Sequence, residues 1–343
     1  MKVLVDIGHP AHVHYFRNVM IRMTQDGHTF KVIVRNKEVS QQLLQAYGIS
    51  YTSRGKGATS RLGKFLYMVK ADIQVFFIAL RFRPDVFLSG ASPYAAHVSW
   101  LLRKPHVALD DTEHAVFARK FYLPFTSKVI TPFCYQLDLG NKQVRMNSFL
   151  ELFYLHPKYR TESTTIRQKL GVTSNEPFAL LRFVSWGASH DYGVKGIDLD
   201  TKLQVIRLLE RTHKILISAE GELPNNLERY RIKVLPHEMH KVLAEADLYI
   251  GEGATMASEC AMLGTPAIYI NKLEVSYVTE ESKHLSIVHT RNATELLDAL
   301  NRMLADGNGK QHAREKLASY IQMLDDPNPI LIEQLEVVHK GKG

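Results

Sequence analysis

Short apolar runs alternate with longer amphipathic segments through the first half of the chain. The runs have the composition of buried strands, and the segments between them carry apolar residues at helical spacing. Strands are therefore expected at 2–7, 30–35, 85–89, 106–109 and 128–131, and helices at 15–25, 38–47 and 93–102. This alternation predicts right-handed βαβ units around a parallel sheet.

A second alternation follows a polar stretch at about 136–175. Strands are expected at 178–184, 214–218, 231–235 and 248–250, and helices at 200–212, 239–246, 294–305 and 311–324. The predicted fold is α/β, with two doubly wound, Rossmann-like domains that face each other across a cleft. We expect these domains at 1–160 and 161–325, followed by a tail at 326–343. Ligands of such folds bind at the carboxyl ends of the strands.

The segment Gly251–Ile270 carries the most specific motif. An apolar strand runs into two glycines, a helix of small residues begins at once, and Glu259 follows one turn into it. Free backbone N–H groups and the positive end of the helix dipole favour a phosphate or diphosphate there. Thr255 adds a hydroxyl and shares a helix face with Glu259, whose carboxylate would lie near a ribose. Strand–glycine–helix junctions that bind nothing are the alternative.

The composition is that of a globular protein, with 45% hydrophobic residues, 23% charged residues and a net charge of +8. Cys134 and Cys260 lie far apart in apolar surroundings, which favours a reduced cytoplasm. The first residues predict a strand and not a signal peptide, and no apolar run is long enough to cross a bilayer. The charge suits an anionic partner, but no recognised nucleic-acid-binding motif occurs, so nucleic acid is not expected.

Residues 54–83 concentrate basic and apolar side chains. The stretch predicts one or two amphipathic helices. These are either core helices with a solvated basic face, which is the more common arrangement, or a patch that touches anionic lipid. The second interpretation would place a cytoplasmic protein peripherally on the inner face of the membrane.

The run ADLYIGEGATMASECAMLGTPAIYI resembles the nucleotide-diphosphate motif of GT-B glycosyltransferases, above all the enzyme that adds N-acetylglucosamine to the peptidoglycan lipid intermediate. The resemblance implies that Gly253, Ala254, Thr255 and Met256 contact a diphosphate and that Glu259 contacts the ribose. The hydrolysing UDP-GlcNAc 2-epimerases share this architecture and a related motif. More narrowly, DIGHPAHVHYFRN, DDTEHA and RFVSWGASHDYG resemble a bacterial and archaeal family without an assigned activity that is placed near these enzymes.

Three histidines follow the first strand, in the loop GHPAHVH. In the resembled glycosyltransferases a glycine-rich loop here lies close to the acceptor and donor phosphates, whereas this chain has a single glycine and Pro10. We expect His9 or His12 to act as a base on an acceptor hydroxyl or to contact the donor phosphates. The alternative is that these histidines satisfy loop backbone groups or cap the following helix.

Acidic residues follow the strand expected at 106–109, where α/β folds form ligand sites. Asp110, Asp111 or Glu113 would deprotonate a sugar hydroxyl. The resemblance to the epimerases implies instead a proton taken from a sugar carbon. A helix start with Asp111 or Thr112 as its N-cap is the competing interpretation.

Loops of the second domain supply the remaining candidates for nucleotide-sugar contacts, which are Arg182, Ser185, Gly187, His190, Glu220 and His237. The Ser-x-Gly-x-Ser loop at 185–189 offers hydroxyl and N–H groups to phosphate, and Arg182 offers positive charge or forms a structural ion pair. The resemblance places His190 near a phosphate-contacting histidine of the epimerases, and it favours uracil as the base beside His237.

No metal site and no cofactor other than a nucleotide-sugar substrate are expected. The acidic residues Asp198 and Asp200 are interpreted as a helix start. The leading hypothesis is a glycosyltransferase that moves a sugar from a nucleotide-diphosphate sugar to a saccharide or lipid-linked acceptor in cell-envelope or polysaccharide synthesis. The alternatives are a UDP-sugar 2-epimerase and a non-catalytic nucleotide-sugar-binding protein.

Overall fold

The computed structural model describes residues 1–57, 60–160, 165–183, 197–219 and 221–341. The chain forms two compact units. Unit 1 consists of Met1–Tyr159 together with Asp325–Gly343, and unit 2 consists of Arg160–Leu324.

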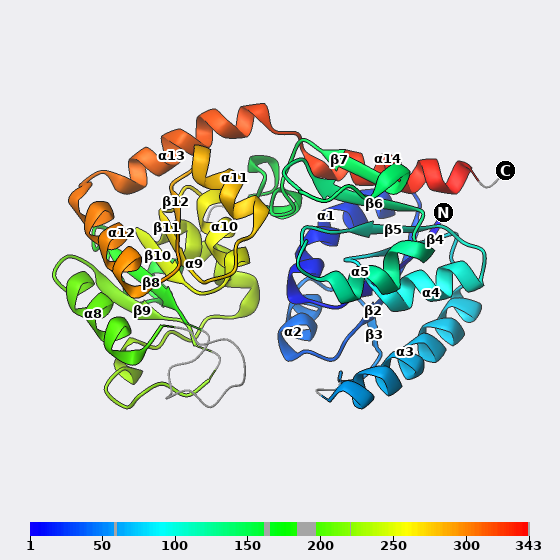
Figure 1. Cartoon of the computed structure of the whole chain (residues 1–343), viewed down its shortest axis with the longest axis horizontal. Helices are drawn as coiled ribbons and strands as arrows, with labels where there is room; N and C mark the ends of the chain where they lie inside the picture. Colours follow the sequence, from blue (N-terminus) through cyan, green and yellow to red (C-terminus); the bar gives the residue numbers. More distant parts are fainter. Residues whose placement is uncertain (58–59, 161–164, 184–196, 220, 342–343) are drawn as a thin grey trace. The chain divides into compact units, whose positions relative to one another are not determined.

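Unit 1 is a parallel sheet with helices on both sides (Figure 1). The strand order is β3-β2-β1-β4-β5-β6-β7, and every neighbouring pair runs parallel. Its elements are β1 (Lys2–Ile7), α1 (Pro10–Gln25), β2 (Thr29–Val34), α2 (Glu38–Ala46), β3 (Tyr51–Ser53), α3 (Arg61–Phe82), β4 (Val86–Ser89), α4 (Pro93–Leu101), β5 (His106–Leu109), α5 (Val116–Tyr122), η1 (Leu123–Phe125), β6 (Lys128–Pro132), η2 (Gly140–Lys142), β7 (Gln143–Met146), α6 (Leu152–Leu155), η3 (Pro157–Tyr159) and α14 (Pro327–Lys340).

Helix α1 begins five residues earlier than the apolar pattern predicted, at Pro10 rather than Tyr15. Proline suits the first helical position, because its fixed φ fits a helix and its missing N–H would have no partner there. The stretch 54–83 contains a single long helix, α3, which begins after Ser60; the Ser60 hydroxyl accepts a hydrogen bond from Gly63 N–H.

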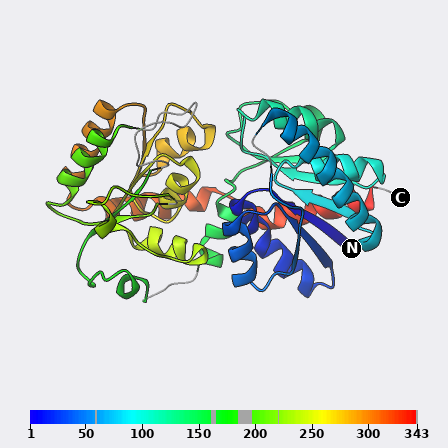
Figure 2. The ribbon, with the colours of Figure 1, turned by 90° about the horizontal axis from the view of Figure 1, so that it is seen from below.

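The C-terminal segment is a helix and not the tail that we expected. Asp326 caps α14 by accepting a hydrogen bond from Asn328 N–H, and Pro327 occupies the first turn. Leu331 and Leu335 of α14 are fully buried. The helix packs within unit 1, where it contacts α1 and the strands β4, β5 and β6 (Figures 1 and 2). The Asp-Pro-Asn-Pro sequence therefore starts a new helix after breaking the previous one.

Unit 2 is also a parallel sheet, with the strand order β12-β11-β10-β8-β9. Its elements are α7 (Ile166–Lys169), β8 (Phe178–Arg182), α8 (Leu199–Leu209), β9 (Lys214–Ile217), η4 (Glu228–Tyr230), η5 (Pro236–Glu238), α9 (Met239–Glu245), β10 (Leu248–Gly251), α10 (Ala254–Met262), β11 (Ala267–Ile270), α11 (Ser276–His284), β12 (Ile287–Thr290), α12 (Ala293–Ala305), α13 (Gly309–Tyr320) and η6 (Ile321–Met323).

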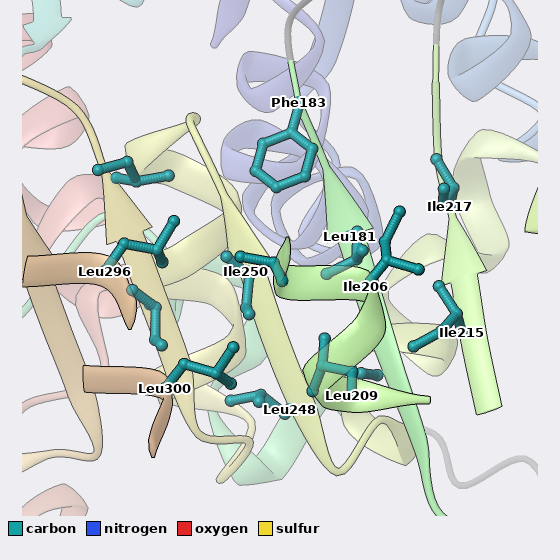
Figure 3. Packing of buried hydrophobic residues seen from close by; sticks show 14 of the residues in the cluster. Leu181, Phe183, Ile206, Leu209, Ile215, Ile217, Leu248, Ile250, Leu296 and Leu300 are labelled. Carbon is teal, nitrogen blue, oxygen red and sulfur yellow. The ribbon is translucent and has the colours of Figure 1, made fainter. Parts of the chain in front are cut away.

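The core of unit 2 fills the space between one face of this sheet and the helices α8 and α12. Figure 3 shows Leu181 and Ile250 from the strands beside Ile206 from α8 and Leu296 from α12. All of these side chains are buried. Strands of a parallel sheet are covered on both faces, which explains why they are almost continuously apolar in the sequence.

The strand expected at 231–235 does not form. Only Arg231 makes an isolated parallel bridge, to Ile217, and the chain then enters the short helix η5 at Pro236. None of the helices in the described part of the chain combines the length and hydropathy that crossing a bilayer requires.

Candidate functional sites in the two units

In unit 1 the strand order changes direction between β1 and β4, and at such a point the loops after the strands part and leave room for a ligand. The loop after β1 holds Gly8 and His9, and the loop after β4 holds Gly90. A Cβ atom built on Gly90 would lie 2.3 Å from Cε1 of His12, so only glycine permits this approach. The two loops therefore meet around the His12 ring.

His12 is a neutral imidazole. Burial lowers its pKa to about 3, and the nearby positive groups of His9, Lys37 and Arg54 act in the same direction. Gly8 N–H donates to His12 Nδ1 at 3.4 Å, so the proton of the neutral ring resides on Nε2. His12 is thus suited to donate a hydrogen bond from Nε2 and poorly suited to take a proton.

His9 is exposed and caps α1, because its Nδ1 accepts a hydrogen bond from Ala11 N–H at 3.3 Å. This is the structural role that was the alternative to catalysis for these histidines.

A buried charged cluster supports the same edge of the sheet. Arg54 Nε donates to Asp6 Oδ1 at 2.8 Å, and Arg54 Nη1 donates to the Tyr67 hydroxyl at 2.6 Å. The Ser92 hydroxyl, at the start of α4, also donates to Asp6. Both charged side chains are almost fully buried. The cluster therefore ties the ends of β1 and β3 to α3 and α4.

Asp110, directly after β5, accepts hydrogen bonds from two tyrosines. The hydroxyls of Tyr122 and Tyr135 both donate to its Oδ2, the latter at 3.1 Å, and Thr112 N–H donates to its Oδ1 at 2.9 Å. Burial raises the pKa of Asp110, although these hydrogen bonds oppose the shift. Tyr122 and Tyr135 were not anticipated, because they lie 12 and 25 residues away in the chain.

Asp111, the next residue in this loop, is half-buried. Burial raises its pKa to about 6, and the negative charges of Asp110 and Glu113 add to the shift. Thr112 Oγ1 donates to Asp111 at 2.8 Å, while Glu113 accepts from Gln136 N–H at 3.2 Å. Neither Asp111 nor Thr112 caps a helix, since α5 begins at Val116 after Ala115.

In unit 2 the strand order changes direction between β8 and β10. Gly251, the last residue of β10, pairs with Arg182, the last residue of β8. Arg182 is half-buried, and its Nη1 donates to the Ser218 hydroxyl after β9 at 2.7 Å. The guanidinium therefore lies at the carboxyl edge of the sheet.

Two residues separate helix α10 from β10, and the N-cap residue of the helix is a glycine. Gly253 is this cap, so the cap residue itself has no side chain to accept from the first N–H groups of the helix. A Cβ atom on Gly251 would lie 2.1 Å from the Tyr249 hydroxyl and 2.8 Å from the Arg182 carbonyl, whereas a Cβ atom on Gly253 would meet no atom of the described residues within 4 Å. Gly251 is needed for packing, and Gly253 leaves the helix start open. The backbone N–H groups of Ala254, Thr255 and Met256 belong to this first turn.

Glu259 is buried one turn further along α10, and its Oε1 lies 3.1 Å from Nε2 of His240 on α9. The alternation of strands and helices in the sequence gives no hint of this pair, because it joins two helices across 19 residues. His237, three residues before His240, is half-buried in η5.

Ser185, Gly187, His190 and Glu220 lie outside the described residues. Asp198 caps α8 by accepting from Thr201 N–H at 2.7 Å, as its interpretation as a helix start predicted. Among the described residues, no group of three or more histidine, cysteine or acidic side chains is arranged to hold a metal ion.

A protein-family model described as "Protein of unknown function (DUF354)" matches residues 1–338. An uncharacterised protein of Methanocaldococcus jannaschii, MJ0665, is 21% identical, and the match covers 98% of each chain.

Solved structures match the whole fold. The UDP-GlcNAc 2-epimerase of Neisseria meningitidis, bound to UDP-GlcNAc, is 12% identical with a TM-score of 0.68, and the match covers 98% of this chain and 99% of the epimerase. The spinosyn rhamnosyltransferase SpnG, complexed with thymidine diphosphate, is 15% identical with a TM-score of 0.65, over 98% and 100% of the two chains. These similarities show the GT-B fold, as the C-terminal motif predicted.

Proposed function

We propose that this chain, which belongs to the DUF354 family, binds a nucleoside-diphosphate sugar in unit 2 and transfers the sugar to an acceptor. One observation carries the proposal. The open start of α10, the Arg182 guanidinium and the His240–Glu259 pair lie around the point where the sheet of unit 2 changes direction.

The start of α10 supplies the diphosphate site. Backbone N–H groups of Gly253, Ala254, Thr255 and Met256 would donate to the phosphate oxygens, and the helix dipole adds positive potential. Arg182 would add a full positive charge. Because negative charge grows on the diphosphate as the glycosidic bond breaks, these groups would stabilise the transition state more than the bound donor.

Glu259 supplies the ribose contact. A buried carboxylate that already has a histidine partner is fixed in orientation, and its oxygens can accept hydrogen bonds from the ribose hydroxyls. His237 would lie toward the base. Bound UDP-GlcNAc in one structural neighbour and thymidine diphosphate in another favour a pyrimidine nucleotide.

Asp111 supplies the base in unit 1. A carboxylate with a pKa of about 6 is deprotonated at neutral pH, yet it holds a proton more strongly than an ordinary aspartate. It would take the proton of the acceptor hydroxyl, while His12 Nε2–H would donate a hydrogen bond to an oxygen of the substrate.

Transfer is favoured over other reactions by the surface of unit 1. Helix α3 exposes large apolar side chains among basic residues, which suits an enzyme whose saccharide acceptor is attached to a lipid. The second candidate is 2-epimerisation of a UDP-sugar. The adjacent carboxylates of Asp110 and Asp111 favour it, because that reaction removes a proton from a sugar carbon.

Calorimetric titration tests the donor site. We expect UDP or TDP to bind the purified protein more tightly than GDP or ADP. Glu259→Gln should weaken this binding about tenfold, the scale of one hydrogen bond to a charged group. Glu315→Gln, an exposed carboxylate on α13, is the matched control. If no nucleotide binds the folded protein, the proposal fails.

Incubation of donor sugars then separates the reactions. A transferase leaves UDP-GlcNAc intact until a saccharide or lipid-linked acceptor is added. An epimerase converts the sugar without an acceptor and incorporates deuterium at C2 in D₂O. Tight binding without either reaction would instead support a non-catalytic binding protein.

A further inference from the structure

Helix α3 carries a continuous row of exposed apolar side chains. Their exposed fractions range from 44 to 64%, and the residues are Phe65, Leu66, Val69, Ile73, Phe77 and Leu80. At 100° per residue they fall within a sector of about 120° on one side of the helix. We call this row the α3 stripe. Single exposed apolar residues are ordinary, but a continuous row of six indicates an interaction surface.

The opposite face of α3 holds the helix in place. Val75 and Ala79 are buried against Leu4 of β1 and Phe87 of β4, in the core of unit 1. Helix α3 also packs against α4 (Figure 1). Turning the α3 stripe inward would therefore empty this core, so the exposure belongs to the folded state.

The charges beside the stripe have one sign. Lys70 and Arg81 are exposed and lie next to the stripe on the helix surface. Residues 54–83 hold seven basic residues and one acidic residue. Of these, Arg54 is buried with Asp6, and the single acid, Asp72, is hydrogen-bonded to His97. The surface thus offers positive charge without nearby free carboxylates of its own segment.

The neighbouring helices continue the pattern. Helix α4, which contacts both α3 and α5, carries Trp100 in its last turn, and α5 begins with Val116 and Phe117. Trp100 is 63% exposed and Phe117 is 74% exposed. Aromatic side chains are favoured where a protein meets the headgroup region of a bilayer.

From these observations we infer that unit 1 binds the surface of an anionic membrane through α3. The helix lies in the plane of the interface, with the α3 stripe among the upper acyl chains and Lys70 and Arg81 at the lipid phosphates. Charge complementarity selects lipid over a second copy of the chain, because two copies would bring their basic residues together. The inference concerns where the protein works and stands whether or not it transfers a sugar.

Co-sedimentation of the full chain with vesicles tests the inference. The vesicles contain phosphatidylcholine alone or with 30% phosphatidylglycerol, at about 50 and 150 mM salt. The test variants are Leu66→Gln/Phe77→Gln and Lys70→Glu/Arg81→Glu. The matched controls are Ile21→Gln/Val337→Gln, at exposed apolar positions of α1 and α14, and Arg302→Glu/Lys316→Glu, at exposed basic positions of unit 2. Light scattering records the mass of every variant.

We expect binding only to the anionic vesicles, weaker at the higher salt concentration. Each test pair should lower the partition coefficient about tenfold or more, and the controls should bind like the unchanged protein. Equal loss in a control pair, or equal binding to neutral vesicles, would overturn the inference. A dimer that Leu66→Gln/Phe77→Gln converts to a monomer, without vesicle binding, would assign the stripe to self-association instead.

Discussion

The imidazole of His240 and the carboxylate of Glu259 are joined across two helices, with Nε2 and Oε1 3.1 Å apart. Glu259 is only 6% exposed, so the histidine both satisfies and orients a buried acid. The two helices that carry them, α9 and α10, flank strand β10 in the sequence. The pair therefore fixes a carboxylate at a set distance from the open start of α10.

Replacing His240 by Phe should weaken nucleotide binding about tenfold, because Glu259 loses the group that orients it. The measurement is a calorimetric titration with UDP or TDP, made beside Glu259→Gln and the double variant. The losses in the two single variants should not add, since both act through one hydrogen bond. Fully additive losses would assign His240 and Glu259 to separate contacts.

The two glycines before α10 should respond differently to alanine. Gly251→Ala should destabilise the protein by about 1–3 kcal/mol, because its Cβ atom would lie 2.1 Å from the Tyr249 hydroxyl. Gly253→Ala should leave the melting temperature nearly unchanged, since its Cβ atom would meet none of the described residues, but it should weaken nucleotide binding by crowding the phosphates. Thermal melts and titrations of both variants check this, and equal melting temperatures would contradict it.

Strands and their order of appearance were largely predictable from the sequence, whereas the side-chain partners were not. The runs at 2–7 and 106–109 are bounded and apolar, so their burial on both faces followed from composition. By contrast, β7 is an edge strand with polar residues, and α11 is mostly polar. Neither segment has regularly spaced apolar residues from which a strand or a helix could be predicted. The segment 231–235 alternates basic and apolar residues as a strand does, but only Arg231 makes a bridge before the chain enters η5 at Pro236.

Some residues of the candidate sites could likewise be predicted from the sequence, and others could not. Arg182 and the start of α10 were expected from their place after strands, because parallel strands end at one edge of a sheet. Burial of Arg54 was not expected, since it lies among exposed basic residues and finds Asp6 only through the fold. Pairs such as Asp110 with Tyr122 depend on tertiary packing in the same way, and no local pattern encodes them.

Activity should fall below about pH 6 as Asp111 takes up a proton, because burial raises its pKa to that value. Asp111→Asn should lower kcat by about 10²–10⁴ and leave nucleotide affinity within about twofold. The measurement is a pH–rate profile of the unchanged protein and of Glu113→Gln. The Glu113→Gln variant should still lose activity below about pH 6. Full activity of Asp111→Asn would remove the residue from catalysis.

Stability should depend on the ionisation of Glu281, which α11 buries against Ser258 of α10. The Ser258 hydroxyl donates to Oε1 at 2.5 Å, and Oε2 has no hydrogen-bond partner among the described residues. Burial raises the pKa of Glu281 to about 8, so the folded state holds a proton that the unfolded chain releases above its ordinary pKa of 4.5.

The protonated Glu281 side chain therefore contributes its full stabilisation below about pH 4.5. This contribution is lost as the pH rises toward 8, and the free energy of unfolding falls by at most about 1.4 kcal/mol per pH unit. Urea unfolding between pH 5 and 9 should show this decline, and Glu281→Gln should flatten it. Glu280→Gln, on the neighbouring position of α11, should leave the slope unchanged. A slope that persists in Glu281→Gln would assign the effect to another group.

Because α14 belongs to unit 1, the polypeptide enters unit 2 at Arg160 and returns at Asp325. Asn328 Nδ2 of α14 donates to the Phe153 carbonyl at 3.0 Å, which joins the last helix to a segment made much earlier. Domains generally fold as units, so unit 2, which is one continuous segment, can fold without α14, whereas unit 1 needs both of its segments. Unit 1 is therefore begun first and is completed only after the whole of unit 2 has been made.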